Sequence, residues 1–206
     1  MKKRIIISIL TVIVCVSAWS AMAQFALNAI DVKPLMVGQE VPDKMLTDGN
    51  GNAKSLHSVI GDKPTVILFY RGDWCGNCIN HFKDEILPNL QKMNSLGYNV
   101  MFISPDDPEH IQTTAGKINA SPAMIYSDAA GDLSVAMGIA WQQQERMLQT
   151  LAGHSGGKNK GFVPVISTFV VGADKRILFE DIRPDGIRAA SRIKGNLLVA
   201  VLENLQ

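Results

Sequence analysis

Two cysteines have the clearest chemistry in this chain of 206 residues. Cys75 and Cys78 are separated by Gly-Asn and follow an apolar run of strand length at residues 65–70. The segment after them has helical periodicity, so the pattern predicts a strand that delivers two thiols to a helix N-terminus. Free backbone N–H groups and the helix dipole favour a thiolate there. Such placement lowers a cysteine pKa from about 8.5 to roughly 3.5–7.5. The spacing therefore predicts a redox centre.

Three residues next to the cysteine pair are further candidates for the site. Arg71 directly follows the predicted strand and is a candidate cation beside the sulfur atoms. Asp73 is a candidate cap for the predicted helix, because a carboxylate there accepts hydrogen bonds from free backbone N–H groups. Trp74 precedes Cys75, and we expect its side chain to form part of a substrate-facing surface.

Other uses of the two cysteines fit the sequence less well. A disulfide that closes four residues adds little stability, because the gain grows with loop length. Structural zinc takes four ligands, and the pair together with His81, one turn further on, falls short of that number. We interpret His81 as a surface or half-buried helix residue. The sequence predicts no metal and no cofactor at this site.

The N-terminal residues have the pattern of a secretory signal peptide. Three basic residues at 2–4 precede a nearly unbroken apolar run at 5–18, and Ala-Met-Ala at 21–23 fits a cleavage site. We expect cleavage before Gln24, which leaves 183 residues with 17 basic and 19 acidic side chains. That length suits one domain, and this charge predicts no surface for nucleic acid. The pattern predicts a periplasmic or secreted protein that has no membrane anchor after residues 1–23 are removed.

The order of the predicted elements is typical of an α/β fold. Strands are predicted at 44–47, 65–70, 98–104, 123–127, 165–171 and 176–181, and helices at 55–60, 74–96, 107–118, 131–137 and 187–205. The helix at 74–96 contains Pro88, which lacks a backbone donor and therefore predicts a kink. This order predicts a mixed central sheet with helices on both faces.

Residues 141–161 are the least regular part of the chain. Residues 142–151 have helical propensity, whereas 153–161 form a glycine-rich polar tract. We interpret this insertion, which includes His154, as a flexible loop without chemistry; the alternative is a lid over the thiols.

Acidic residues outside the motif are assigned structural roles. Asp106 and Asp107 precede a predicted helix, and Asp181 ends a predicted strand. Caps and turns explain these positions better than a paired-carboxylate mechanism does.

The element order and the sequence Phe-Tyr-Arg-Gly-Asp-Trp-Cys-Gly-Asn-Cys at 69–78 resemble the thioredoxin fold. More narrowly, the chain resembles the alkyl hydroperoxide reductase/thiol-specific antioxidant (AhpC/TSA) family of peroxiredoxin-like redoxins over about residues 35–206. Val-Gly-Gln-Glu-Val-Pro-Asp at 37–43 and Val-Pro-Val-Ile-Ser-Thr-Phe-Val-Val at 163–171 match patterns of that family. The resemblance implies one thioredoxin-like redoxin domain at 24–206.

The resemblance also implies two alternative roles for the cysteines. In the thioredoxin register, Cys75 is the attacking thiol and Cys78 the resolving thiol. In the peroxiredoxin register, Cys78 is the peroxidatic cysteine and Arg71 stands at the motif's proline. Ile166 stands where thioredoxins have a cis-proline facing the disulfide, and near the position of the peroxiredoxin arginine. Phe69 replaces the buried acid of thioredoxins. We expect these departures to alter the substrate groove.

The leading hypothesis is thiol–disulfide exchange in the periplasm, in which the Cys75 thiolate attacks a disulfide and Cys78 then releases the product. The alternative is a thiol-dependent peroxidase, in which Cys78 or Cys75 is oxidised to sulfenic acid. A third hypothesis is a non-enzymatic module that binds metal through its thiols. The two enzymatic hypotheses require a disulfide or peroxide substrate and a thiol electron donor.

Overall fold

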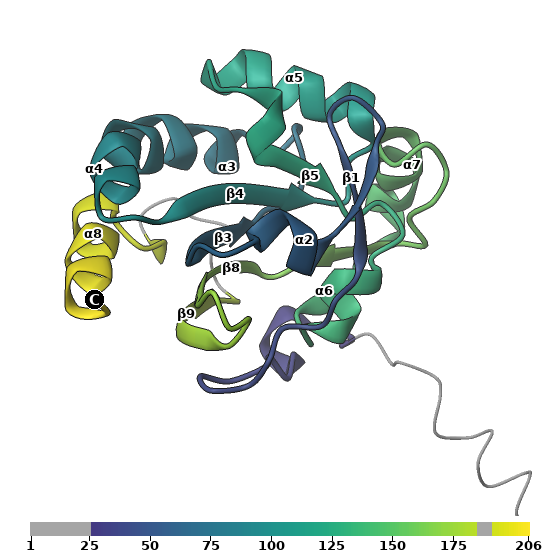
Figure 1. Cartoon of the computed structure of the whole chain (residues 1–206). Helices are drawn as coiled ribbons and strands as arrows, with labels where there is room; N and C mark the ends of the chain where they lie inside the picture. Colours follow the sequence, from purple (N-terminus) through teal and green to yellow (C-terminus); the bar gives the residue numbers. More distant parts are fainter. Residues whose placement is uncertain (1–25, 185–190) are drawn as a thin grey trace, which may run out of the picture.

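The structure, a computed structural model, describes residues 26–184 and 191–206, so the expected signal peptide at 1–23 lies outside it. Seven strands form one mixed sheet in the order β2-β1-β5-β4-β3-β8-β9 (Figure 1). Their bounds are β1 Met45–Asp48, β2 Ala53–Ser55, β3 Thr65–Phe69, β4 Asn99–Ser104, β5 Ile125–Ser127, β8 Ile166–Val171 and β9 Ile177–Arg183. Helices pack on both faces of the sheet, which confirms the predicted α/β architecture.

Strand β3 occupies the centre of the sheet and leads into the cysteine motif. It pairs in parallel with β4 and antiparallel with β8, and all five of its residues are buried. A strand covered on both faces needs a continuous apolar run rather than an alternating one, which is why residues 65–70 could be identified from the sequence.

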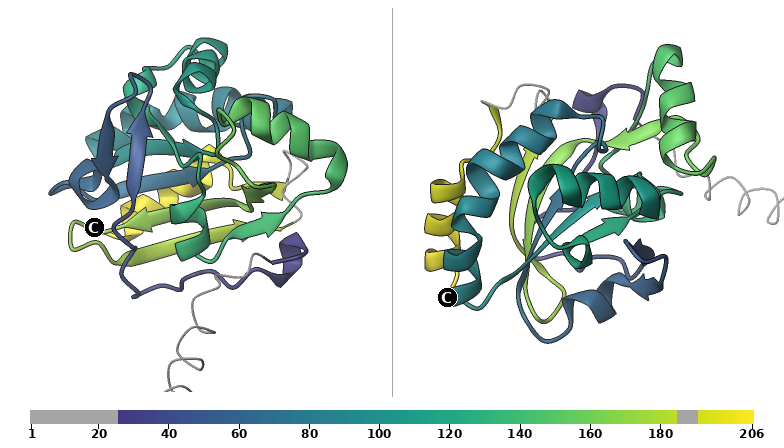
Figure 2. Two further views of the ribbon diagram at one scale, coloured as in Figure 1. Left: turned by 90° about the vertical axis from the view of Figure 1, so that its right-hand side faces the viewer. Right: turned by 90° about the horizontal axis from the view of Figure 1, so that it is seen from above.

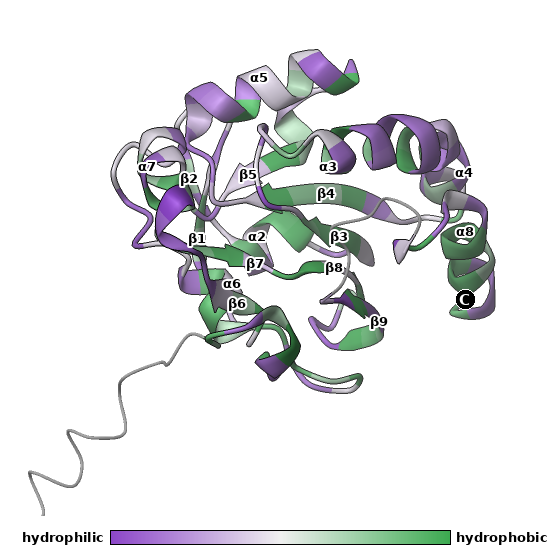
Figure 3. Ribbon diagram, turned by 180° about the vertical axis from the view of Figure 1, so that it is seen from behind, coloured by the Kyte–Doolittle hydropathy of each residue, from purple (hydrophilic) through white to green (hydrophobic). Residues whose placement is uncertain are grey.

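Successive residues of β3 contribute to two separate cores. Val66 and Leu68 face the core beneath α3 (Gly76–His81), α4 (Leu90–Ser95), α5 (Pro108–Ile118) and α8 (Gly195–Asn204). Ile67 and Phe69 face the core beneath α2 (Leu56–Ile60) and α6 (Asp132–Ala136). Figure 3 shows the resulting distribution, with hydrophobic residues concentrated on the central strands β3, β4 and β8. The period of two along the strand therefore places one helical layer on each side.

The helix predicted at 74–96 is one interrupted rod rather than a regular helix. It begins with α3, continues as a π-helical segment (η3, Phe82–Ile86) and a 3-10 turn (η4, Leu87–Asn89), and ends as α4. Pro88 lies in the 3-10 turn, where the regular α-helix is interrupted, as its missing backbone donor leads one to expect. The helical hydrogen bonds begin at Gly76, two residues later than predicted.

The insertion at 141–161 contains regular structure, and the helical propensity of residues 142–151 is confirmed. It contains α7 (Glu145–His154) between two short strands, β6 (Ala140–Gln142) and β7 (Phe162–Pro164), which pair with each other. The polar tract is ordered by Asn159, whose buried side chain accepts hydrogen bonds from the backbone N–H groups of Gly161 and Phe162. Hydrogen bonds to one buried amide side chain therefore hold this tract, which has no periodic apolar pattern from which its structure could be predicted.

The C-terminal helix α8 lies against the α3–α4 rod (Figure 2). It begins at Gly195, later than the predicted start at residue 187, and residues 185–190 lie outside the description. A side chain at Gly195 would collide with the carbonyl oxygen of Glu85 in η3, so this close approach requires glycine. Within residues 26–184 and 191–206, none of the helices is long and apolar enough to cross a bilayer.

Candidate active site

A disulfide joins Cys75 and Cys78 at the end of the loop that follows β3. Cys75 is the N-cap residue of α3, and the backbone N–H of Cys78 donates to the carbonyl oxygen of Cys75 at 2.8 Å. Both residues are buried, with exposed fractions of 2% and 0%. The predicted placement of both sulfur atoms at the start of the helix is therefore confirmed.

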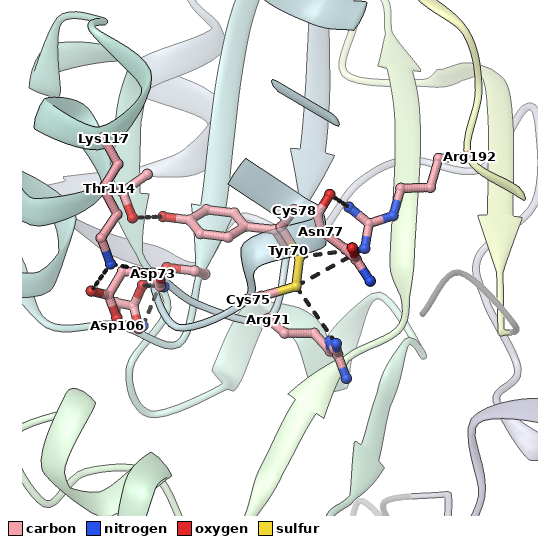
Figure 4. Close-up of a disulfide and its surroundings, with 11 residues drawn as sticks. Tyr70, Arg71, Asp73, Cys75, Asn77, Cys78, Asp106, Thr114, Lys117 and Arg192 are labelled. Atoms are coloured by element: carbon pink, nitrogen blue, oxygen red, sulfur yellow. Dashed lines mark hydrogen bonds and ion pairs between the residues drawn. A yellow bond between two sulfur atoms is a disulfide. The ribbon is translucent and has the colours of Figure 1, made fainter. Parts of the chain in front are cut away.

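Two guanidinium groups lie against the sulfur atoms (Figure 4). Nη2 of Arg71 lies 3.6 Å from Cys75 Sγ. Nη2 of Arg192 lies 3.6 Å from Cys78 Sγ and 4.0 Å from Cys75 Sγ. The expected cation at Arg71 is thus present, and Arg192, which precedes α8, supplies a second one.

Two hydrogen bonds position Arg192 over the cysteine motif. Its Nη1 donates to the carbonyl oxygen of Asn77 at 2.7 Å, and Nε2 of His81 donates to the carbonyl oxygen of Ile193 at 2.8 Å. His81 is buried rather than at the surface or half-buried as expected, and burial lowers its pKa. A neutral His81 ring anchors the segment that carries Arg192 without placing a further positive charge near it.

The guanidinium charges favour thiolate forms of both cysteines when the disulfide is reduced. Burial, and then the charge of Arg71, lower the pKa of Arg192 to about 10, so Arg192 remains protonated at neutral pH. An opposite charge within about 4–6 Å lowers the pKa of an acidic group by roughly 1–3 units. The arginines therefore act in the same direction as the free N–H groups at the start of α3.

Asp73 does not cap α3, contrary to expectation, and instead joins a buried polar cluster. Its Oδ2 accepts a hydrogen bond from Lys117 Nζ at 2.9 Å, and its Oδ1 lies 2.6 Å from Nδ1 of His154. The backbone N–H of Asp73 donates to Oδ2 of Asp106 at 2.8 Å. The side chain of Asp73 is drawn away from the helix by this cluster, where the lysine ammonium is a stronger partner than backbone N–H groups.

Asp106 is buried beside Asp73 rather than acting as a cap or turn residue. Burial, and then the negative charge of Asp73, raise the pKa of Asp106 to about 7. Its Oδ2 accepts a hydrogen bond from the hydroxyl of Ser104 at 3.1 Å. The neighbouring residue Asp107 does cap α5 as predicted, since Oδ1 accepts from the backbone N–H of His110 at 3.0 Å.

Gly72 allows the cysteine loop to approach this cluster. Its φ of 138° is in the region that favours glycine, and a Cβ there would lie 2.5 Å from Trp74 Nε1 and 2.7 Å from Asp106 Oδ1. Any larger residue would separate the loop from Asp106.

Trp74 and Ile166 pack against the hydrophobic core that contains both cysteines. The Trp74 ring is half-buried, with the Arg71 guanidinium carbon 5.1 Å from its centroid, which is a cation–π distance. Ile166 is half-buried at the start of β8 and lines a cavity of about 10 Å³, together with His81 and Arg192. Such a volume fits about one water molecule.

The sequence analysis missed the contacts that three residues make at the site: Arg192 with the sulfur atoms, Lys117 with Asp73, and His154, which had been assigned to a loop, also with Asp73. A basic residue just before a C-terminal helix carries no local signal of a contact with a motif 114 positions earlier. Asp181 lies within β9, opposite Thr168 of β8, rather than at a cap or turn as expected, and its carboxylate pairs with Arg183 at 2.6 Å.

The sequence model of the AhpC/TSA family matches residues 37–179. Among solved structures, the chain is similar to peroxidoxin BcpB from Mycobacterium tuberculosis, with 19% identity, coverage of 84% of this chain and 99% of that one, and a TM-score of 0.61. It is also similar to peroxiredoxin 5 from Alvinella pompejana, with 17% identity, coverage of 83% and 99%, and a TM-score of 0.62.

A third similar structure is a putative thioredoxin reductase from Burkholderia cenocepacia, with 13% identity, coverage of 82% and 98%, and a TM-score of 0.61. No curated protein matches the chain in sequence. At these identities the structural neighbours support the fold, and the family match supports the chemistry. The chain belongs to the AhpC/TSA family and is a thiol-dependent oxidoreductase.

Proposed function

We propose that Cys75 and Cys78 form the redox centre and cycle between a dithiol and a disulfide. The observation that carries this proposal is the contact of both sulfur atoms with guanidinium groups, at 3.6–4.0 Å, in a pair already close enough to be bonded. A structural cross-link of four residues needs no such cations, because its sulfur atoms carry no charge in either the folded or the unfolded chain.

Cys75 is the attacking thiol in this proposal. Its sulfur contacts both guanidinium groups, whereas Cys78 contacts that of Arg192. The thiolate is therefore stabilised more at Cys75, and Cys78, one turn further along α3, is placed to resolve the oxidised intermediate.

The substrate that best fits this site is a small hydroperoxide. With at most 2% of either cysteine exposed, an extended protein disulfide cannot reach the sulfur in line unless the surrounding segments move. A peroxide needs far less room. Its O–O bond also develops negative charge on the leaving oxygen as it breaks, and Arg71 and Arg192 are positioned to stabilise that charge.

The proposed reaction has two steps in the protein. The Cys75 thiolate attacks one peroxide oxygen, so that an S–O bond forms, the O–O bond breaks, and the leaving alkoxide or hydroxide takes a proton from water. Cys78 then attacks the sulfenic sulfur, which releases water and closes the disulfide seen here. A thiol electron donor restores the dithiol by exchange.

Thiol–disulfide exchange is the second candidate. It is favoured by the Cys-Gly-Asn-Cys spacing itself, since one helical turn lets the second thiol reach a mixed disulfide on the first. We further propose that the chain acts in the periplasm or outside the cell, because residues 1–23 have the composition of a cleaved signal peptide. N-terminal sequencing of the exported protein, with Gln24 expected first, tests the location.

A sulfenic-acid probe distinguishes the two candidates. After treatment of the reduced protein with hydrogen peroxide, Cys78→Ser is expected to retain a trapped sulfenic acid on Cys75. The wild type is expected to close the disulfide and to consume peroxide when dithiothreitol is supplied. A sulfenic acid trapped on Cys78 in Cys75→Ser would reverse the two roles. Reduction of insulin disulfides without measurable peroxide consumption would replace the peroxidase proposal with disulfide exchange.

A further inference from the structure

Asp73, Asp106 and His154 come from three separate segments and meet beside the cysteine loop. Asp73 lies between β3 and α3, Asp106 between β4 and α5, and His154 at the C-terminal end of α7. One ligand atom from each residue lies within 4.8 Å of the other two. Figure 4 shows the two carboxylates side by side, with Lys117 approaching from α5. The redox proposal does not use this cluster.

Each carboxylate presents one oxygen to the protein and the other to the centre of the cluster. Oδ2 of Asp73 accepts from Lys117 Nζ, and Oδ2 of Asp106 accepts from Ser104 Oγ and from the backbone N–H of Asp73. The two Oδ1 atoms both face Nδ1 of His154, at 2.6 Å for Asp73 and 3.9 Å for Asp106. These hydrogen-bond donors orient the two Oδ2 atoms and leave the two Oδ1 atoms available to bind a ligand. We call Asp73 Oδ1, Asp106 Oδ1 and His154 Nδ1 the inner atoms of the cluster.

The three inner atoms are buried, and Asp106 Oδ1 has no polar partner among the described residues closer than His154 Nδ1 at 3.9 Å, whereas Asp73 Oδ1 and His154 Nδ1 face each other at 2.6 Å. Asp73 Oδ1, Asp106 Oδ1 and His154 Nδ1 are each shielded from solvent without a hydrogen bond of acceptable geometry among the described residues. The side chain of Asp106 is 1% exposed and that of Asp73 is 6% exposed. A buried acceptor without a donor costs about 1–3 kcal/mol, and more if it is charged. A cation bound between the two carboxylate oxygens and the imidazole nitrogen would offset this cost.

We propose that Asp73, Asp106 and His154 bind one divalent transition-metal ion through these three atoms. Imidazole nitrogen with carboxylate oxygens is a donor set suited to Zn²⁺, and three protein ligands leave a fourth position for water. Metal–ligand bonds of about 2.1 Å in a tetrahedral site separate ligand atoms by roughly 3.4 Å. The two distances from His154 Nδ1, 2.6 and 3.9 Å, lie on either side of that value, so small side-chain rotations suffice.

This ion joins the insertion to the cysteine loop. It links the end of α7 to Asp73, two residues before Cys75, and so fixes the folded insertion beside the redox centre. The site is independent of the thiols, because neither cysteine belongs to the cluster of ligand atoms. It therefore differs from a site in which the reduced cysteines hold the metal.

Calorimetric titration of Zn²⁺ into the oxidised protein tests the proposal, because the closed disulfide removes both thiolates as ligands. We expect one Zn²⁺ per chain, and at least about tenfold weaker binding in His154→Gln and in Asp106→Asn. The matched control is His57→Gln, which removes another imidazole, one that contacts the carbonyl oxygen of Val41, and should leave the affinity unchanged.

Mn²⁺ provides a second measurement that locates the ion. Paramagnetic broadening of amide NMR signals should be strongest at Gly72, Asp73, Asp106 and His154. Absence of both binding heat and broadening at about millimolar metal, or an affinity within about threefold of wild type in either variant, would overturn the proposal. If Asp106→Asn does not fold, His154→Gln decides the question, since His154 is 25% exposed and α7 contributes one buried residue, Leu151, to the interior.

Discussion

Replacement of Arg192 by methionine removes the guanidinium that contacts both sulfur atoms. In the structure its Nη2 lies 3.6 Å from Cys78 Sγ and 4.0 Å from Cys75 Sγ, and the residue is 4% exposed. Methionine preserves much of the apolar packing of the side chain without the charge. The variant therefore tests whether the positive charge of Arg192, rather than the packing of its side chain, lowers the pKa of the thiols.

The size of the effect follows from the distances. Two unit charges 4 Å apart interact by about 4 kcal/mol at an effective dielectric constant near 20, which corresponds to roughly 3 pKa units. Acidic groups next to a single arginine shift by about 1–3 units in practice. We expect the lower thiol pKa to rise by about 1–3 units in Arg192→Met. The reduction potential should fall by about 30 mV for each unit, because the thiolate form loses stability relative to the disulfide.

Ultraviolet absorbance of the thiolate, followed across a pH titration of the reduced protein, gives the pKa directly. Alkylation by neutral iodoacetamide at acid pH should slow by about 3- to 50-fold, since the loss of thiolate is partly offset by the higher nucleophilicity of a more basic thiol. Arg176→Met is the matched control, because Arg176 directly precedes β9 and its guanidinium donates to the carbonyl oxygen of Gly38 rather than contacting the sulfur atoms. A folded Arg192→Met with unchanged thiol pKa values would refute the electrostatic reasoning.

Three predictions concern stability and are checked by urea unfolding. Burial raises the pKa of Asp128 to about 6, above the value of about 3.9 in an unfolded chain, so the folded state binds more protons between these values and stability falls by roughly 3 kcal/mol as pH rises through them. Asp128→Asn should remove this part of the slope and leave the part that comes from Asp106, whose pKa is also raised; a slope identical to that of the wild type would contradict the assignment. Gly195→Ala should cost about 1–3 kcal/mol through its collision with Glu85, whereas Gly116→Ala, with open space at Cβ, should not destabilise. Phe82→Ala should cost about 3–5 kcal/mol, because its ring packs against those of Tyr70, His81 and Phe102; a loss below about 1 kcal/mol would mean that neighbouring side chains refill the cavity.

Local physical rules predicted the central scaffold correctly. The strand at 65–70 is a continuous apolar run because both of its faces are covered, and Pro88 interrupts the long helix because it lacks a donor. Asp107 before Pro108 marks the start of α5, since the cap and the missing donor act within one turn. Each of these signals acts between neighbours in the sequence.

Contacts between distant segments were not predictable in the same way. Asp73 is a good cap by residue type, but Lys117 and His154 provide stronger partners that only the folded chain brings together. Arg192 reaches the disulfide because His81 and Asn77 hold its segment in place, and no periodic pattern records such bonds. The candidate site was therefore located from the sequence, while its electrostatics required the tertiary structure.

Equilibration of the protein in dithiothreitol redox buffers tests the central claim most directly. Trp74 fluorescence can follow the transition, since its ring lies next to Cys75 in the chain, and mass analysis of the Cys75–Cys78 peptide can identify the bond. The account predicts a reversible two-electron transition between dithiol and disulfide that is lost in Cys75→Ser and in Cys78→Ser. Two thiols that stay free across the whole range of buffers, or a bridge that no reductant opens in the folded protein, would contradict it.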